Sequence, residues 1–208
     1  CTAVISDMEQ PLGRTVGNAL EVKEAIAALR GEGPADLMEL CMELGSFMLK
    51  LGGVADDADA AREMLGDVIS SGAALEKLRL MVSAQGGDAS QVDHPETLPG
   101  AAFSTELRGG EAGFVQGLEA ITVGKASMLL GAGRETKTST IDLGAGIVLH
   151  KKRGDVVAAG DLLAVLHSNT ESRLATAREA LAQAYQIGPQ APEERPLIHG
   201  IVDPNLPS

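Results

Sequence analysis

The hydrophobic pattern of this chain changes once along its length, and that change limits it to folds with two differently built parts. Up to residue 87, apolar residues recur at the three- and four-residue spacing of amphipathic helices. After residue 100, short apolar runs alternate with glycines, as in strands joined by tight turns. We therefore predict a mixed α/β chain with a helix-rich part at 1–87, a Pro- and Gly-rich linker at 88–100 and a strand-rich part at 101–208.

The helix-rich part is predicted to hold one strand followed by four helices. The apolar run at 2–6 has the length of a short buried strand. Each helical pattern stops at a glycine, which favours the end of a helix. The helices are expected to begin near Asn18, Pro34, Ala58 and Ala73.

The strand-rich part is predicted to be antiparallel, because its strands are short and follow one another through tight turns. Two helices interrupt the strands, and Asn169 is expected to cap the second, which ends at Gly188. The expected strands are 101–108, 112–119, 140–150 and 161–168, and the expected helices are 122–130 and 169–188.

Composition and charge exclude several classes of function. The chain has 17 Lys and Arg against 29 Asp and Glu, a net charge of -12, which argues against binding to nucleic acid or to an anionic membrane. No apolar run reaches the roughly 18 residues of a spanning helix, and no secretory signal opens the chain. The two cysteines, Cys1 and Cys41, are expected to be reduced thiols in a cytoplasmic protein. Because no initiator Met precedes Cys1, we expect a piece of a longer polypeptide.

Two weaker patterns admit a functional and a structural interpretation. His150 and His167 end predicted strands that flank one turn region, so they could approach one another, or they are ordinary strand-end residues. The glycine-rich loop at 130–134 could hold an anion through its backbone N–H groups, or it is a flexible surface turn.

The segment 139–168 has glycine turns spaced as in biotinyl and lipoyl carrier domains, which it resembles. A carrier needs a lysine at an exposed hairpin tip, and Lys151 and Lys152 lack the flanking residues that carriers use. We therefore expect a barrel-sandwich shape for this lobe without carrier function.

A group of oxygen donors surrounds the first predicted turn. The carbonyls of Leu12 and Thr15 are predicted to lie in irregular chain, and the Glu24 carboxylate follows in the next helix. Carbonyls with one carboxylate are suited to a hard, weakly charged cation. The alternative is that Glu24 lies on a solvated helix face.

Several motifs together resemble the pyrimidine nucleoside phosphorylase family, which includes thymidine phosphorylase. The most specific is Gln-Pro-Leu-Gly-Arg at 10–14, continued by Val-Gly-Asn-Ala-Leu-Glu-Val-Lys-Glu at 16–24. The resemblance covers essentially the whole chain. Its other matching segments are 7–8, 31–37, 39–41, 84–88, 130–134, 141–143, 146–152 and 154–155.

The resemblance implies a reversible phosphorolysis, in which phosphate attacks C1′ of a pyrimidine nucleoside and gives the free base and a pentose 1-phosphate. It also implies that the phosphate loop and the base-reading residues lie upstream of the matched part, so no catalytic or substrate-binding residue is assigned in this chain. The fold implied is the second part of the family's large α/β domain followed by its C-terminal lobe. The small helical domain through which the family forms homodimers is missing.

Two groups of residues carry over from the family. Its members hold potassium through the backbone at the positions of Leu12 and Thr15 and the carboxylate at Glu24. Position 15 is often Ala in relatives, which a backbone ligand tolerates. The loop bearing Gly131, Gly133 and Arg134 lies near a cleft that closes, where the glycines would allow movement and Arg134 would pair with an acidic group.

Two hypotheses for the function follow. In the first, the chain is the C-terminal half of a pyrimidine nucleoside phosphorylase and is active only when paired with the N-terminal half of the same enzyme. In the second, it is a catalytically silent binding or scaffold lobe that keeps the fold.

Overall fold

The computed structural model describes residues 1–203, which form two compact units, each made of separate stretches of chain. Unit 1 contains Cys1–Asp7, Ala25–Glu96 and the chain from Arg195 onward, and unit 2 contains Met8–Glu24 and Thr97–Glu194. The boundary at Glu96 falls within the predicted linker 88–100. Residues 8–24, in contrast, pack with the strand-rich unit rather than with the helices that follow them.

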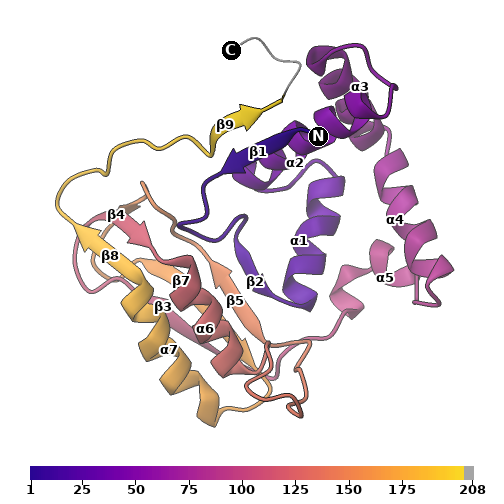
Figure 1. The fold of residues 1–208 in the computed structure, drawn as a ribbon. Coiled ribbons are helices and arrows are strands. Elements are labelled where there is room, and N and C mark those ends of the chain that lie inside the picture. Colours follow the sequence, from indigo (N-terminus) through magenta and orange to yellow (C-terminus); the bar gives the residue numbers. More distant parts are fainter. Residues whose placement is uncertain (204–208) are drawn as a thin grey trace. The chain divides into compact units, whose positions relative to one another are not determined.

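Unit 1 consists of helices, as the periodicity predicts, and of a two-stranded sheet whose second strand was not predicted (Figure 1). No helix of the described chain is both long enough and apolar enough to traverse a bilayer. The elements are β1 (Ala3–Ser6), the part of α1 (Ala19–Leu29) from Ala25 onward, α2 (Ala35–Leu51), α3 (Ala58–Ser70), α4 (Ala73–Ala84), α5 (Ser90–Asp93), most of a 3-10 helix (Pro95–Thr97) and β9 (Ile198–Val202).

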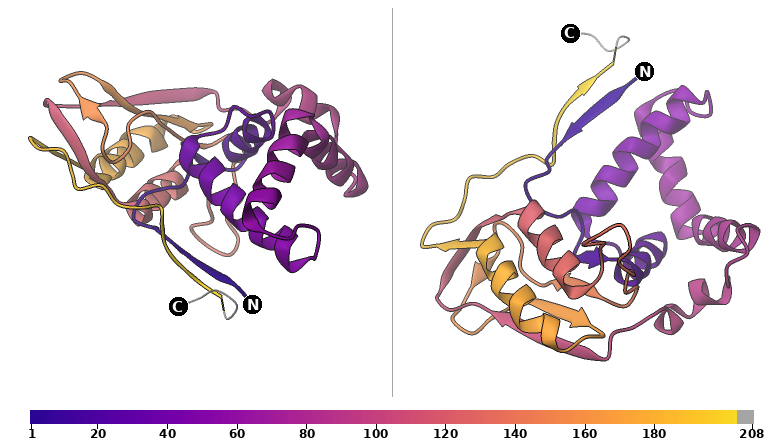
Figure 2. Two further views of the ribbon diagram at one scale, coloured as in Figure 1. Left: turned by 90° about the horizontal axis from the view of Figure 1, so that it is seen from above. Right: turned by 60° about the horizontal axis from the view of Figure 1, so that its bottom comes forward.

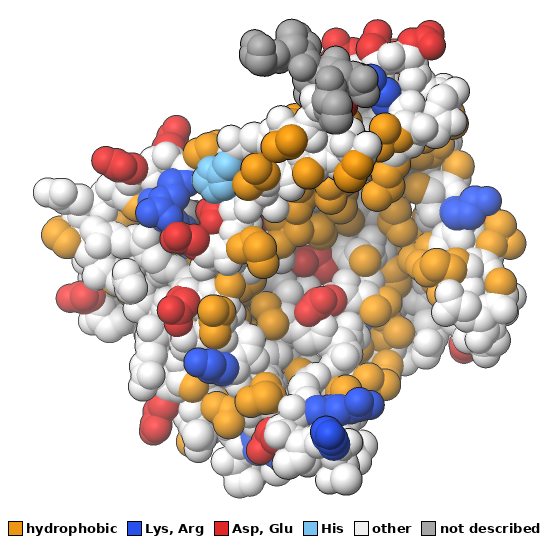
Figure 3. Space-filling view, viewed as in Figure 1, with side chains coloured by type: hydrophobic (Ala, Val, Ile, Leu, Met, Phe, Trp, Pro, Cys, Tyr) orange, Lys and Arg blue, Asp and Glu red, His pale blue; other side chains and the backbone are white. Residues whose placement is uncertain are grey.

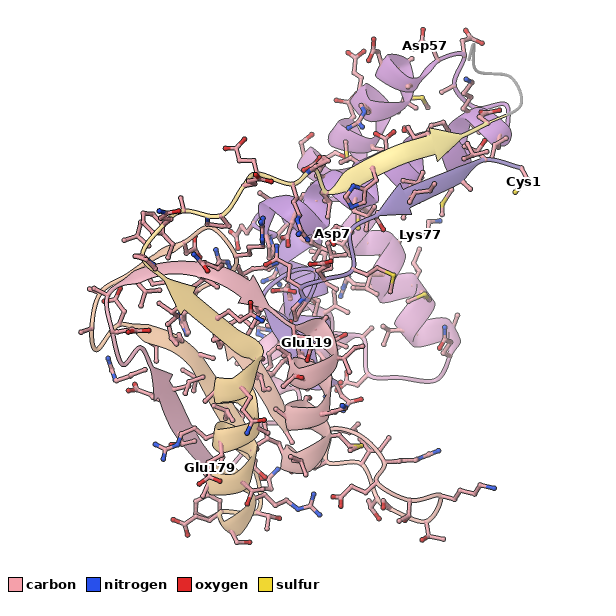
Figure 4. All side chains as sticks on the ribbon, turned by 60° about the vertical axis from the view of Figure 1, so that its left-hand side comes forward. Cys1, Asp7, Asp57, Lys77, Glu119 and Glu179 are labelled. Atoms are coloured by element: carbon pink, nitrogen blue, oxygen red, sulfur yellow. The ribbon has the colours of Figure 1, made fainter. Side chains whose placement is uncertain are left out.

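The residues at the starts of α3 and α4 explain why these two helices could be located from the sequence. The Asp57 side chain accepts a hydrogen bond of 2.8 Å from the Ala60 N–H and so caps α3 (Figure 4). Gly72, in the left-handed conformation, separates α3 from α4. Both helices have the predicted starts.

The strand predicted at 2–6 is present as β1, and its partner comes from the other end of the described chain. β1 pairs antiparallel with β9, with Ala3 opposite Val202. The Thr2 hydroxyl donates to Asp203 Oδ2 at 3.0 Å, and the Asp7 N–H donates to the Leu197 carbonyl at 2.8 Å. The strands lie side by side in both ribbon figures (Figures 1 and 2).

Unit 1 buries little of its apolar surface. Its buried hydrophobic residues, among those described, are Ile26, Ala61 and Val92. Hydrophobic side chains remain at the surface around β1 and β9 and along α4 (Figure 3). The most exposed on α2, on α4 and in the turn after α2 are Met48, Leu51, Val54, Leu80 and Met81, each at least 50% exposed. Exposed apolar patches in proteins mark surfaces that bind another protein, a membrane or a ligand.

Unit 2 is built from two antiparallel sheets, two helices and the start of α1 up to Glu24. One sheet has the order β2-β5-β7-β3 and the other the order β6-β4-β8. The strands are β2 (Thr15–Gly17), β3 (Phe103–Arg108), β4 (Gly113–Leu118), β5 (Gly146–Leu149), β6 (Val156–Val157), β7 (Leu162–Ser168) and β8 (Tyr185–Gly188), and the helices are α6 (Ala120–Leu130) and α7 (Ser172–Ala184).

The main core of the described chain lies in unit 2, where α6 and α7 pack against each other and against the sheets (Figure 2). Leu, Ile, Val and Ala fill it, as expected for a chain with 2% aromatic residues. Its fully buried side chains include Val115, Val123, Leu130, Ile147, Leu166 and Leu181.

The last helix of unit 2, α7, differs from the prediction at both of its ends. Asn169 does not cap α7, whose N-cap position is Glu171. The Asn169 side chain instead accepts from the Ala102 N–H at 2.8 Å and donates to Asp142 at 2.9 Å, so it joins two loops. The helix also ends at Ala184 rather than Gly188, because Tyr185 is extended and begins β8.

Tyr185 links the second sheet to the first. The single O–H of its side chain is shared between two acceptors, the carbonyls of Lys151 at 3.0 Å and Leu163 at 3.1 Å. Burial, helped by the Asp155 charge, raises the pKa of this phenol well above its ordinary value. The neutral phenol is therefore the form that the fold stabilises.

This raised pKa predicts a loss of stability in alkaline solution. Because the folded pKa lies above the value of about 10 for an unfolded tyrosine, the contribution is complete below pH ~10 and falls as the pH rises further. Urea unfolding across this range measures it, and Tyr185→Phe is expected to remove the pH dependence at a cost of about 1 kcal/mol near neutrality. Since Tyr185 is the single tyrosine and there is no tryptophan, phenolate absorbance reports this residue alone. Titration of the folded protein near pH 10 would contradict the prediction.

Candidate functional site

The candidate site is the loop that precedes β2, together with the first turns of α1. Leu12 lies in a bend and is 37% exposed, which agrees with the predicted irregular chain. Glu24 reaches back from α1, and its Oε1 accepts a hydrogen bond of 2.9 Å from the Arg14 N–H. The Glu24 carboxylate therefore faces the loop and binds its backbone, while its role toward a cation stays a prediction.

A buried lysine fixes the same loop from the other side. Lys152 is 8% exposed, and its Nζ donates to the Gly13 carbonyl at 2.9 Å. The other Glu24 oxygen, Oε2, lies against Gly13 where a side chain would project. The peptide of Gly13 is thus held between one cationic and one anionic group, which no sequence pattern indicated.

The sequence predicted irregular chain at Thr15, and this prediction is wrong. Thr15 begins β2 and lies opposite Val148 of β5. A three-residue edge strand has too few residues to show the alternation that identifies strands. The Leu149 N–H donates to the Arg14 carbonyl at 2.7 Å, so Arg14 and Leu149 form a hydrogen-bonded pair. Hydrogen-bonded and non-bonded pairs alternate in antiparallel sheets, and the Thr15 carbonyl therefore points away from β5 at the edge of the sheet.

The donor set at this loop fits a monovalent cation. The Thr15 Oγ1 is buried and has no hydrogen-bond partner among the described residues, although buried hydroxyls are normally satisfied. Carbonyl and hydroxyl oxygens with a single carboxylate suit a large, weakly charged ion. The described chain has no cluster of three or more His, Cys, Asp or Glu side chains that could hold a metal, so a cation here would depend mainly on neutral oxygens.

The loop after α6 is held in place at its first residue. Gly131 caps α6 with φ 107°, in the left-handed region that favours glycine, and its carbonyl accepts from the Asp142 N–H at 2.9 Å. The N–H groups of Gly131 and Ala132 donate back to α6 carbonyls. These two groups are therefore occupied and do not form the anion cradle considered for this loop.

The rest of this loop is more open. Gly133 packs on Met128, and Arg134 is exposed to solvent. The Ala132 carbonyl accepts from the Asn18 side chain at 2.8 Å, which connects the loop to the start of α1. The structure thus ties Ala132 to α1 and leaves Arg134 in contact with solvent.

His150 and His167 do not approach one another. In the β5–β7 ladder His167 is opposite Gly146, whereas the His150 N–H donates to Leu163, so the two residues lie at opposite ends of the ladder. Burial and the nearby Lys23 charge lower the pKa of His167, which favours a neutral ring.

The lysines of the segment 139–168 do not form a carrier site. Lys152 is buried, and Lys151 donates to the Val156 carbonyl at 2.7 Å and pairs with Asp161 at 3.2 Å. Neither amine is at the exposed hairpin tip where a cofactor would be attached.

Comparison with known families and proteins agrees with this architecture. The glycosyl transferase family a/b domain matches residues 1–75, and the pyrimidine nucleoside phosphorylase C-terminal domain matches residues 114–188. A pyrimidine-nucleoside phosphorylase of Staphylococcus haemolyticus is 48% identical over 200 residues, 96% of this chain and 46% of the relative. That of Geobacillus stearothermophilus is 53% identical over 169 residues, 81% of this chain and 39% of the relative.

The two matched domains define the class: this is a glycosyltransferase-type α/β segment followed by a phosphorylase C-terminal lobe. More particularly, the chain belongs to the pyrimidine nucleoside phosphorylase family and corresponds to its C-terminal portion. It spans less than half the length of the curated relatives it matches.

Proposed function

We propose that this chain forms the C-terminal portion of a pyrimidine nucleoside phosphorylase, which transfers the pentosyl group of a pyrimidine nucleoside to inorganic phosphate. The observation that carries the proposal is identity of 48% with a protein of that name across 96% of the chain. Two family domains also match this chain, at residues 1–75 and 114–188.

In this proposal the N-terminal half of the enzyme supplies the phosphate loop and the residues that bind the base. The motifs for both are missing from these 208 residues. The exposed apolar side chains of α2 and α4 are a surface that the N-terminal half would cover. The homodimer and the cytoplasmic location implied by the resemblance belong to this intact enzyme.

The chain's own contribution is the cation site. The carbonyls of Leu12 and Thr15 and the Glu24 carboxylate would hold potassium, with the remaining ligands coming from the N-terminal half. The bound ion would supply positive charge and brace the phosphate loop against α1. Arg134 would pair with an acidic group when the cleft closes, and Gly131 and Gly133 would shape that loop.

A second candidate is a catalytically silent scaffold lobe, which the lack of every upstream motif favours for the 208 residues taken alone. Under this alternative, the Glu24 carboxylate serves only to hold the loop through the Arg14 N–H. The two candidates differ in whether the chain becomes part of an active enzyme when the N-terminal half is added.

The test is an assay of phosphate-dependent release of thymine or uracil. We expect none from the pure 208-residue chain, because phosphorolysis depends on positioned phosphate and base contacts that this chain lacks. We expect release when the chain is co-expressed with the N-terminal half. Activity of the pure chain would contradict the assignment of the catalytic residues to the other half, and an inactive full-length enzyme would support the scaffold alternative.

A further inference from the structure

We infer that the Thr15 hydroxyl is itself a ligand of the cation, so that Thr15 contributes its side chain as well as its carbonyl. The inference rests on the proposed cation site. It adds the side-chain oxygen of a residue that was expected to bind the ion through its backbone carbonyl alone. It assigns a function to a side chain that the structure otherwise leaves unexplained.

The first observation is the unsatisfied state of the hydroxyl. The Thr15 Oγ1 is buried and has no hydrogen-bond partner among the described residues. Burying a hydroxyl without a partner is unfavourable, and an unsatisfied buried group in a native protein commonly indicates a water molecule or an ion. A group that accepts the hydroxyl proton, or an ion that binds the hydroxyl oxygen, is therefore expected beside Thr15.

The second observation is the placement of the other donors. The register of β2 turns the Thr15 carbonyl away from β5, and the residue before it, Arg14, donates its N–H to Glu24. The one carboxylate of the donor set is thus bound to the peptide adjoining Thr15. The Gly13 carbonyl, in contrast, is already bound by Lys152, so the loop oxygens considered for the ion are those of Leu12 and Thr15.

The two explanations of the unpartnered hydroxyl, an ion or a water molecule, predict different effects on potassium affinity when the hydroxyl is removed. Valine has the shape of threonine without the hydroxyl and suits a strand. If a water molecule binds the hydroxyl, valine would release that water without changing the affinity for potassium. If the hydroxyl binds the cation, valine would lower the affinity for potassium. The potassium-free protein would then gain stability, because the unsatisfied hydroxyl is gone.

The experiment uses the full-length enzyme that contains this chain, as wild type, Thr15→Val, Thr15→Ser and Glu24→Gln. Potassium binding is measured by calorimetry and by the rise in Tm on adding KCl, with choline chloride holding the ionic strength constant. We expect Thr15→Val to bind potassium about tenfold more weakly, the effect of losing one ligand of this strength. Thr15→Ser should retain the wild-type affinity, because serine keeps the hydroxyl.

A further readout separates ligation from a packing effect. In choline chloride, Thr15→Val is expected to melt at a higher temperature than wild type, and in KCl this advantage should shrink or reverse. Neither change depends on catalytic activity.

The outcomes distinguish the two proposals. Equal potassium affinity in wild type and Thr15→Val, with weakened binding in Glu24→Gln, overturns the role of the hydroxyl and leaves the cation site standing. No potassium binding by the wild type overturns both. Weaker binding by Thr15→Val and Thr15→Ser alike would also overturn the inference, because the hydroxyl would then not be what matters.

Discussion

Replacing Gly146 with alanine is expected to lower the free energy of unfolding by about 2–5 kcal/mol. Gly146 has φ 156°, and a Cβ at this position would lie 2.5 Å from the Val16 carbonyl oxygen. It would also meet the Cα of Gly17, the residue opposite in the β2–β5 ladder. The Leu20 side chain, 2.9 Å from this position, can shift, but the nearest atom belongs to the backbone of β2, so the strands must separate to admit a methyl group.

Gly124→Ala is the matched control for this change. Gly124 lies on the exposed side of α6, and nothing surrounds the position of its missing Cβ. Alanine there should be neutral or stabilise the protein by up to about 1 kcal/mol, because it favours the helix. Urea unfolding of both variants measures the difference, and similar stabilities would show that β2 and β5 tolerate separation.

The Gly146 prediction has a consequence for the candidate site. β2 carries Thr15, and β5 holds the preceding loop through the bond from the Leu149 N–H to the Arg14 carbonyl. Separation of these strands would displace the cation ligands. We therefore expect Gly146→Ala to lose potassium binding in the full-length enzyme even under conditions where the protein stays folded.

Replacing Glu24 with glutamine is expected to weaken potassium binding about ten- to hundredfold. Glutamine removes the one formal negative charge of the donor set, and a charge-assisted contact contributes about 1.5–3 kcal/mol. It keeps an oxygen that accepts from the Arg14 N–H, so the loop should stay in place. Potassium titration of phosphorolysis by the full-length enzyme measures the change.

Glu21→Gln is the control for Glu24→Gln. Glu21 lies on the same helix, and its Oε1 accepts from the Gly17 N–H at 2.8 Å, so it also binds backbone near the loop. If the charge of Glu24 acts on the cation, only Glu24→Gln should shift the potassium dependence by this amount. Equal potassium dependence in wild type and Glu24→Gln would show that Glu24 only holds the loop.

The helices of unit 1 could be predicted because their signals are local. α3 and α4 start at the predicted residues, 58 and 73, since Asp57 and Gly72 mark those ends in the sequence itself. The change from helices to antiparallel strands after residue 100 is confirmed for the same reason. Each of these features depends on residues within one turn or one strand.

The features that the sequence did not predict depend on contacts between distant residues. Nothing local separates α7 from β8, and Tyr185 is extended because it pairs with Leu118. Asn169 precedes a helix, as a cap would, but its side chain binds Ala102 and Asp142 instead. Local preference was overruled in both cases by partners that only the fold brings near.

The candidate site likewise combines features that could be predicted from the sequence with features that could not. The Leu12–Thr15–Glu24 donor set was identified on one short motif through the family resemblance, and its function stays a prediction. The Lys152 contact with Gly13 spans 139 positions of the sequence and carries no motif of its own. The unpartnered Thr15 hydroxyl is visible only when all neighbouring groups are placed.

The pairing of β1 with β9 imposes an order on synthesis and folding. The bond from Thr2 to Asp203 joins residues 201 positions apart, and every residue of unit 2 leaves the ribosome before Ile198–Val202 of β9 does. Unit 2 can therefore complete its core before β9, the partner of β1 among the described residues, is synthesised, and an unpaired strand edge is open to pairing with another chain. β9 cannot pair with β1 until the stretch from residue 7 to residue 202 has been translated.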